Sequence, residues 1–380
     1  MAPLLLRVAR THSSRWKTHA TMTSLFDPVS MTRGPGLKNR FMLAPLTNLQ
    51  SHVDGTLSDD EYNWLTLRAQ GGFGGTMTCA SHVQAQGQGF PGQLGCWSDA
   101  HLPGLTRLAA GIKAAGSTAY VQLHHAGMRS PRDLIGTQPV CPSDDAETGS
   151  RALALAEVEQ LRDDFIAAAV RADHAGFDGV ELHGAHGYIL SQFMSSTYNR
   201  REDRYGGSLE NRCRLVYEII DGIRARCRPD FTLGIRVSPE RFALLLAEMR
   251  KIVQGLLHDG RLDFIDLSLW DVFKEPNEDG FKSKPLVDWF MDLDRSDVKI
   301  GVAGRIMDAA TARRCLEHGA DFVTIGRAAI LHHDFPERVR ANPDFAAMPL
   351  PVSAGHLRAE GLGPAFVGYM QTWKGFVAEA

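Results

Sequence analysis

The chain has 380 residues and a mass of 41.7 kDa, a length that fits one α/β barrel or two average domains. Its 44% hydrophobic and 22% charged residues exclude a disordered or collagen-like chain. The formal net charge of −3 predicts no nucleic-acid partner, and no apolar run reaches the roughly 18 residues of a membrane span, so no membrane partner is expected.

The first 25 residues differ from the rest of the chain in charge. They contain basic residues but no Asp or Glu, and they are taken as a leader, residues 1–25. Two interpretations stay open, a mitochondrial transit peptide and a disordered extension. We therefore expect a cytoplasmic protein, or a mitochondrial one if the leader is a transit peptide.

Eight short apolar runs, each typical of a buried parallel strand, recur from residue 37 onward. They cover residues 41–45, 75–80, 118–123, 179–183, 233–237, 264–269, 299–303 and 322–326.

Amphipathic helical patterns lie between several of these runs. Ser58, with Glu61 three residues later, has the spacing of a capping box and predicts a helix through residue 70. Further helices are predicted over residues 157–175, 211–226, 247–258 and 308–318.

The repeated strand and helix units predict an α/β fold, a single closed (β/α)₈ barrel over residues 26–340 with its active site at the C-terminal ends of the strands. Residues 341–380 are a C-terminal extension, expected to pack on the barrel or at a subunit contact, or to form a lid with the aromatic residues Tyr369, Trp373 and Phe376. The alternative is an open doubly wound sheet. However, the glycine-rich run 71–75 precedes a strand instead of following one, so it lacks the context of a dinucleotide-binding turn.

Polar residues alternate near the ends of several predicted strands. Gln122 and His124 share one face of the third strand, and Glu181 and His183 share one face of the fourth. Arg236 lies at the end of the fifth. Burying such groups costs several kcal/mol unless they find partners, so the mouth of the barrel is predicted to hold a polar ligand.

Glycines follow the last two predicted strands, at the usual phosphate site of such barrels. Gly304 follows the seventh strand, and Gly326 follows the eighth and is succeeded by Arg327. Backbone N–H groups at such turns, with an arginine beside them, favour a phosphate-bearing cofactor or substrate.

A metal site is not expected. His183 and His186 are three residues apart, but a third ligand is missing, and the six cysteines form no C-x-x-C pair. We interpret the histidine pair as contacting a ligand.

Four motifs carry a resemblance to a known family. Residues 39–47 (NRFMLAPLT), 122–127 (QLHHAG), 183–193 (HGAHGYILSQF) and 199–212 (NRREDRYGGSLENR) occur in the order and spacing of the old yellow enzyme family. The chain resembles these flavin-dependent ene-reductases over roughly residues 25–340.

The resemblance implies a tightly bound FMN and assigns residues to it. The flavin ring and its pyrimidine edge would be contacted by Ala44, Pro45, Leu46, Thr47, Ala80, Gln122 and Arg236, and the phosphate by Gly304, Gly326 and Arg327. Thr47 stands where one subgroup carries a redox-tuning cysteine.

The resemblance also implies the chemistry. His183 and His186 would bind the substrate by donating hydrogen bonds to its carbonyl oxygen, and Tyr188 would protonate the α-carbon. NADPH or NADH would reduce the flavin, and an electrophilic alkene would reoxidise it by a ping-pong mechanism. The protein would be an NAD(P)H-dependent flavin oxidoreductase that reduces α,β-unsaturated carbonyl compounds, with a homo-oligomer left open. The His–His pair replaces the His–Asn pair of other members, so the subclass stays open.

Three alternatives stay open. One is a flavin enzyme of the same barrel that acts in oxidative demethylation or nitro-compound reduction. Another is a flavin-free, phosphate-binding lyase or isomerase, for which a Schiff-base lysine at a strand end is missing. The last is a non-catalytic scaffold, which the inward polar residues disfavour.

Overall fold

A computed structural model describes residues 23–378 of the chain. The predicted leader therefore lies, except for its last three residues, outside the described residues. Leu25 is buried in the hydrophobic core, and its carbonyl accepts a hydrogen bond from the Arg40 N–H at 2.9 Å. Within the described range, no helix combines the length and apolarity that crossing a membrane would need.

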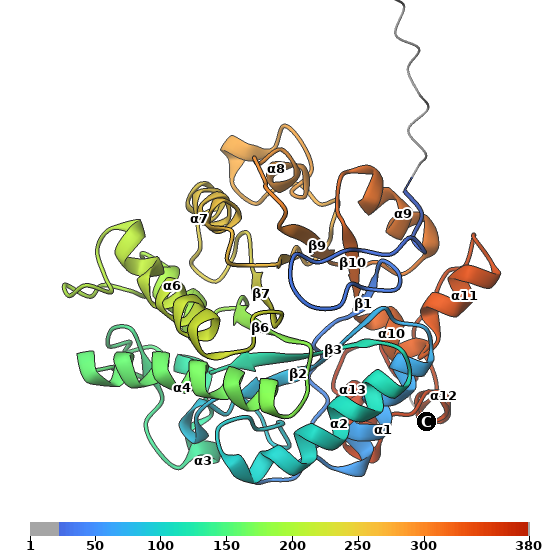
Figure 1. Cartoon of the computed structure of the whole chain (residues 1–380), viewed down its shortest axis with the longest axis horizontal. Coiled ribbons are helices and arrows are strands. Elements are labelled where there is room, and N and C mark those ends of the chain that lie inside the picture. The colour runs from blue at the N-terminus through green and yellow to red at the C-terminus, as the bar shows by residue number, and fades with distance from the viewer. Residues whose placement is uncertain (1–22, 379–380) are drawn as a thin grey trace, which may run out of the picture.

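Eight parallel strands close into a barrel in the order β1-β10-β9-β8-β7-β6-β3-β2 (Figure 1). They are β1 (Phe41–Leu43), β2 (Gly75–His82), β3 (Thr118–His124), β6 (Gly179–Gly184), β7 (Thr232–Val237), β8 (Phe264–Ser268), β9 (Lys299–Ala303) and β10 (Phe322–Ile325). The predicted (β/α)₈ barrel is confirmed, and each predicted strand ends within two residues of the observed one.

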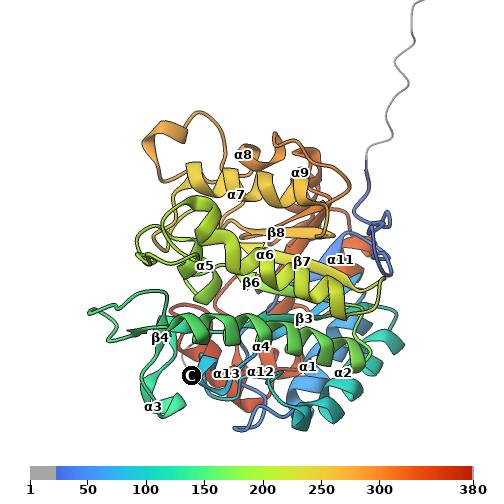
Figure 2. The same ribbon diagram turned by 60° about the vertical axis from the view of Figure 1, so that its left-hand side comes forward.

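Helices cover the outside of the barrel, and Figure 2 shows three of them, α4, α6 and α7, stacked over the strands. The helices of the barrel are α1 (Asp59–Gln70), α2 (Leu102–Ala114), α4 (Leu155–His174), α6 (Leu209–Arg226), α7 (Leu246–Asp259), α8 (Asp288–Met291), α9 (Ala309–Glu317), α10 (Arg327–Leu331) and α11 (Phe335–Ala341). The five predicted helices are confirmed, whereas α2 was not predicted. The short helices α3 (Arg132–Ile135) and α5 (Ile189–Met194), and a two-stranded sheet of β4 (Val140–Cys141) and β5 (Arg151–Ala152), lie in the loops.

Ser58 caps the start of helix α1 as predicted, but only half of the capping box forms. The Ser58 hydroxyl accepts a hydrogen bond from the Glu61 N–H at 3.1 Å. The Glu61 carboxylate is turned inward, where it accepts hydrogen bonds from Asn48 and Ser51. Glu61 thus ties the start of α1 to the loop that follows β1.

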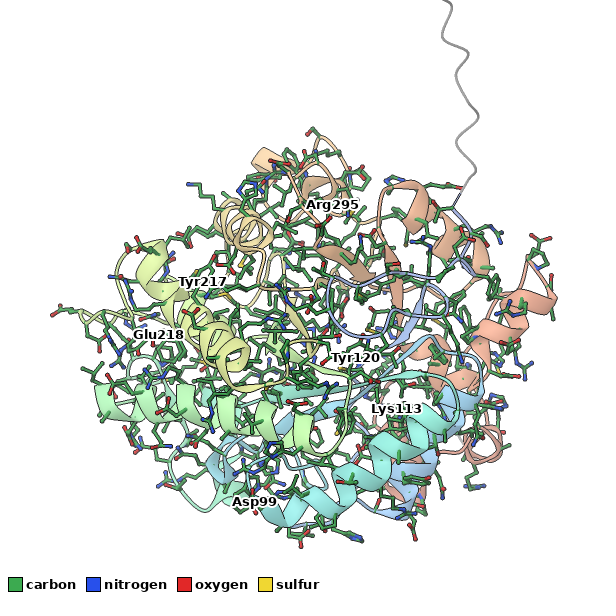
Figure 3. The ribbon with its side chains drawn as sticks, viewed as in Figure 1. Asp99, Lys113, Tyr120, Tyr217, Glu218 and Arg295 are labelled. Atoms are coloured by element: carbon green, nitrogen blue, oxygen red, sulfur yellow. The ribbon has the colours of Figure 1, made fainter. Side chains whose placement is uncertain are left out.

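The N-terminal end of the barrel is filled by large apolar side chains. A separate cluster of buried residues, defined by its common packing, consists of Val29, Leu37, Met42, Met77, Tyr120, Phe264 and Phe322. Figure 3 labels Tyr120 near the middle of the barrel. Glycines on neighbouring strands make room for these rings, because a Cβ on Gly301 would lie 2.1 Å from the Phe322 ring.

The C-terminal helices α12 (Ala354–Ala359) and α13 (Pro364–Gln371) lie beside α1 in both views (Figures 1 and 2). Trp64 of α1 and Phe366 of α13 meet edge to face, with ring centroids 4.8 Å apart. The Gly363 N–H donates a hydrogen bond to Gln50 Oε1 at 2.7 Å. These contacts fix α13 next to the loop that follows β1.

Gly301→Ala should destabilise the protein, because the added methyl group must push the Phe322 ring out of its place. We expect the free energy of unfolding to fall by about 1–3 kcal/mol, the usual cost of overpacking a core. Chemical denaturation measures it. Gly280→Ala is the matched control, since a Cβ there meets no atom within 4 Å. Adding Phe322→Leu to Gly301→Ala should recover part of the loss. An unchanged midpoint in the single variant would contradict this account of the barrel interior.

Candidate active site

Two adjoining cavities of about 810 Å³ and 620 Å³ open at the C-terminal ends of the strands. They share four lining residues, Pro45, Leu46, His186 and Trp373. All thirteen residues that the sequence singled out line one or both cavities, although they come from seven of the eight strands or from the loops that follow them. The first cavity contains Ala44, Arg236, Gly304, Gly326 and Arg327, and the second contains Thr47, Ala80, Gln122, His183 and Tyr188.

Beneath the cavities, four polar side chains form a layer across the barrel. Gln122 pairs with Glu181 on the neighbouring strand, and its amide Nε2 donates to Glu181 Oε1 at 2.7 Å. Arg236 lies opposite Asp266 on the next pair of strands, with Nε 3.1 Å from Asp266 Oδ2. All four side chains are buried. The strand register therefore places one guanidinium among two carboxylates and an amide.

The charges of this layer depend on one another. Burial raises the pKa of Glu181, and the neighbouring Asp266 carboxylate raises it further, while Arg236 opposes both. Burial also raises the pKa of Asp266, again against Arg236. Because one guanidinium balances one carboxylate, the layer is neutral when Glu181 keeps its proton.

His183, His186 and Tyr188 lie together above this layer. The His183 ring centroid is 4.9 Å from that of Tyr188 and 5.1 Å from that of His186. Burial lowers the pKa of His183 well below its usual range, and the neighbouring histidines lower it further. Burial also lowers the pKa of His186, to about 3. Both imidazoles are therefore neutral hydrogen-bond donors at physiological pH.

The backbone at His186 is held in an unusual conformation. Its φ of 61° lies in the left-handed region, which costs energy for a residue with a side chain. Its N–H donates to the Ser238 hydroxyl at 3.0 Å, and its carbonyl accepts from Arg129 at 2.6 Å. The turn after β6 therefore fixes where the His186 ring points.

Tyr188 retains its proton at neutral pH. Burial raises the pKa of its phenol, and the Arg129 guanidinium, 5.1 Å from the ring centroid, only partly opposes this. The cation keeps the phenol able to release a proton during a reaction. The position combines a protonated group with a means of stabilising its anion.

The far end of the first cavity is positively charged. Arg305 pairs with Asp271 at 3.5 Å, whereas Arg327 has no carboxylate partner within the described part of the chain. Burial lowers the pKa of Arg327, and the neighbouring Arg305 lowers it further. A Cβ on Gly304 would lie 2.8 Å from the backbone nitrogen of Asp271, so glycine permits this close approach. Two neighbouring guanidiniums favour an anion between them.

Tyr369 and Trp373, two of the C-terminal aromatic residues that the sequence singled out, line the second cavity from α13 and its end. Sequence reasoning missed two further lining residues, Met370 of α13 and Phe90 of the loop after β2. No periodicity in the sequence indicates that these two side chains face the mouth of the barrel.

The family model described as the NADH:flavin oxidoreductase / NADH oxidase family matches residues 24–344. The chain is 34% identical over 327 residues to a Bacillus subtilis protein named "Probable NADH-dependent flavin oxidoreductase YqiG", covering 83% of this chain and 87% of the relative. It is 32% identical over 334 residues to an NADPH dehydrogenase of the same species, covering 86% and 97%.

Solved structures of other proteins have the same fold as this chain. The old yellow enzyme homologue from Zymomonas mobilis has a TM-score of 0.76 and 26% identity, covering 91% of this chain and 99% of that one. Morphinone reductase in complex with tetrahydroNAD has a TM-score of 0.76 and 28% identity, covering 91% and 96%. Some relatives are much longer: the chain spans 36% of the NADH:fumarate oxidoreductase of Klebsiella pneumoniae, to which it is 32% identical over 338 residues, or 84% of this chain.

The buried neutral histidines should make the protein sensitive to mild acid. A histidine whose pKa is lowered by folding binds a proton more readily in the unfolded chain, so stability is complete above about pH 6.5 and falls as the pH drops toward the folded value. For His125 and His186, each with a folded pKa of about 3, we expect a loss of about 2 kcal/mol each at pH 5. Urea unfolding between pH 8 and pH 5 measures this.

Replacing one such histidine supplies the control. His125→Gln should make the free energy of unfolding fall less steeply with decreasing pH, whereas His258→Gln should not, because His258 is exposed. Equal slopes in wild type and His125→Gln would contradict the assignment.

Proposed function

The chain belongs to the NADH:flavin oxidoreductase / NADH oxidase family, and from this premise we propose that it reduces activated carbon–carbon double bonds, those of α,β-unsaturated carbonyl compounds. As a member, it is an NAD(P)H-dependent flavin oxidoreductase with FMN as cofactor. The observation that carries the proposal is the group of two neutral imidazoles and a protonated phenol in one cavity with Thr47, Ala80 and Gln122.

The residues beneath the cavities fit a flavin. Gln122 Oε1 is buried and has no hydrogen-bond partner within residues 23–378, so it offers an acceptor to a ring N–H such as that of the flavin pyrimidine. Arg236 offers positive charge beside it, which suits the edge of the ring that becomes negative on reduction. The apolar residues Ala44, Pro45 and Leu46 would contact the ring face.

The positively charged end of the first cavity fits the FMN phosphate. Arg327, unpaired with any carboxylate of residues 23–378, would form a charge-assisted hydrogen bond with the phosphate oxygens. Gly304 and Gly326 let the backbone approach the same point. The phosphate would thereby anchor the cofactor and define the direction in which the ring lies.

Bound FMN supplies hydride transfer, taking hydride from NADH or NADPH and delivering it to the alkene. The N–H groups of His183 and His186 would hold the substrate carbonyl oxygen. As hydride adds to the β-carbon, electron density moves to this oxygen, and the two donors stabilise the resulting negative charge. Because both rings are neutral, they give hydrogen bonds without first having to be protonated.

Tyr188 would complete the reduction by protonating the α-carbon. The hydroxyl proton moves to carbon, the enolate collapses to the saturated carbonyl compound, and the tyrosinate recovers a proton from water. Hydride and proton together add one H₂ equivalent across the double bond, and NAD(P)H is oxidised to NAD(P)⁺. A positioned general acid of this kind typically raises the rate by a factor of about 10² to 10⁴.

Arg327→Ala should weaken the binding of FMN. Loss of a hydrogen bond to a charged group corresponds to a roughly 10- to 150-fold rise in the dissociation constant. Titrating FMN into the apoprotein and following the quenching of flavin fluorescence measures it. Arg107→Ala is the matched control, because Arg107 pairs with Asp59 on the outer helices. Unchanged affinity in Arg327→Ala would place the phosphate elsewhere.

Tyr188→Phe should separate the two half-reactions. Reduction of the flavin by NADPH needs no proton from Tyr188 and should change little. Reoxidation by 2-cyclohexenone should slow by a factor of about 10² to 10⁴, since the ring and its packing remain but the proton is gone. Stopped-flow absorbance of the flavin measures both rates.

Tyr369→Phe is the control, because it removes a phenol from the same cavity on the side of α13. It should leave the ratio of the two rates near that of the wild type. Equal losses in both half-reactions of Tyr188→Phe would indicate a structural tyrosine and exclude it as the proton donor.

A further inference from the structure

A continuous row of hydrogen bonds runs through three histidines at the mouth of the barrel. His124 Nδ1 lies 3.0 Å from His183 Nδ1, and His183 Nε2 lies 3.0 Å from His186 Nδ1. His186 Nε2 lies 2.7 Å from the hydroxyl oxygen of Ser268. The row begins at the end of β3, crosses to β6 and its turn, and ends on β8.

The number of hydrogens in this row is fixed. Burial lowers the pKa of all three histidines far enough that each is neutral at physiological pH and carries one N–H. Each hydrogen bond needs one hydrogen between its two atoms, so the choice made by one ring determines the others. Only two arrangements satisfy all three bonds.

In the first arrangement, the hydrogens point from His124 toward Ser268. His124 donates from Nδ1, and His183 and His186 both carry their hydrogen on Nε2. In the second arrangement, every hydrogen points the other way. His183 and His186 then carry theirs on Nδ1, and His124 is left with a hydrogen on Nε2.

The surroundings of His124 Nε2 distinguish the two arrangements. This atom is buried and has no hydrogen-bond partner within residues 23–378. Its neighbourhood is the loop after β2, where a Cβ on Gly89 would lie 3.4 Å from it. A buried N–H without an acceptor is rarer than an unused lone pair. The second arrangement leaves such an N–H and the first does not, so the first arrangement is favoured.

We propose that His124 is a positioning residue for the reduction: its Nδ1–H, donated to His183 Nδ1, holds the hydrogens of His183 and His186 on their Nε2 atoms. This inference rests on the proposed function, in which those two N–H groups bind the substrate oxygen. An incoming carbonyl oxygen competes with His186 Nδ1 for the His183 Nε2–H. Accepting a bond at Nδ1 also polarises the His183 ring, which makes its Nε2–H a better donor.

Two variants of His124 separate its hydrogen bond from its packing. The His124 ring also meets the Tyr188 ring edge to face, with centroids 4.4 Å apart. His124→Phe keeps an aromatic ring there but removes the donor. His124→Asn gives up the ring but places an amide N–H close to where the imidazole Nδ1–H was.

The probe is 4-chlorophenol, whose phenolate oxygen stands for the enolate oxygen and whose ring gives a long-wavelength charge-transfer band over oxidised flavin. Each holoenzyme is titrated with 4-chlorophenol, and we expect the dissociation constant of the phenol to rise about tenfold in His124→Phe. His124→Asn should recover most of the affinity. Equal loss in both variants, or none in His124→Phe, would overturn the proposal.

A second measurement needs no activity. Long-range ¹H–¹⁵N correlation spectra of the histidine-labelled wild-type holoenzyme report which ring nitrogen carries the hydrogen. We expect His183 and His186 to be protonated on Nε2, and His183 protonated on Nδ1 would overturn the inference even if the variants failed to fold. A wild-type enzyme that gives no phenol band while showing Nε2 tautomers would instead contradict the proposed function and leave the role of His124 in setting the tautomers standing.

Discussion

The architecture of the site depends on burying the Arg236 guanidinium inside a closed barrel. A charge at that depth is tolerated only with a partner, and the parallel register supplies Asp266 directly opposite on the next strand. A second carboxylate, Glu181, lies in the same layer and joins Gln122 to it. The charges of the layer cancel when only one of the two carboxylates is ionised. Removing any one of the four side chains would therefore leave a buried charge or polar group without its partner.

This layer divides the barrel into two parts with different tasks. Along β3, the inward positions two residues apart run from Tyr120 in the apolar cluster, through Gln122 in the layer, to His124 at the mouth. Strand β8 has the same order of layers, with Phe264 in the apolar cluster, Asp266 in the polar layer and Ser268 at the mouth. The aromatic end gives the barrel its close packing, while the other end presents polar atoms whose partners are only partly supplied by the protein. Stability and chemistry are thus assigned to opposite ends of the same strands.

Much of this could be predicted from the sequence, and the limits have physical reasons. Short apolar runs in a β–α alternation were sufficient to predict the barrel, because strands that are buried on both faces contain few polar residues. Helix α2 was missed since Pro103, Gly104 and Gly111 interrupt its pattern. The candidate residues at the strand ends, which line the two cavities, could be selected because their motifs are contiguous. For Tyr369 and Trp373 the sequence left a lid, a helix on the barrel and a subunit contact open, because their position depends on how a distant helix docks. The hydrogen-bonded row of histidines likewise requires the register of three strands.

The docking of α13 bears on the shape of the second cavity. Gln50 follows the loop that lines the cavities, and its side-chain oxygen accepts a hydrogen bond from the Gly363 N–H at the start of α13, so this helix and that loop are joined directly. Met370 and Trp373 line the second cavity together with His183. The second cavity is thus lined partly by the barrel and partly by a helix that docks on it from the C-terminal end of the chain. The position of a helix far away in the sequence therefore helps to determine the shape of the cavity on which the proposed function depends.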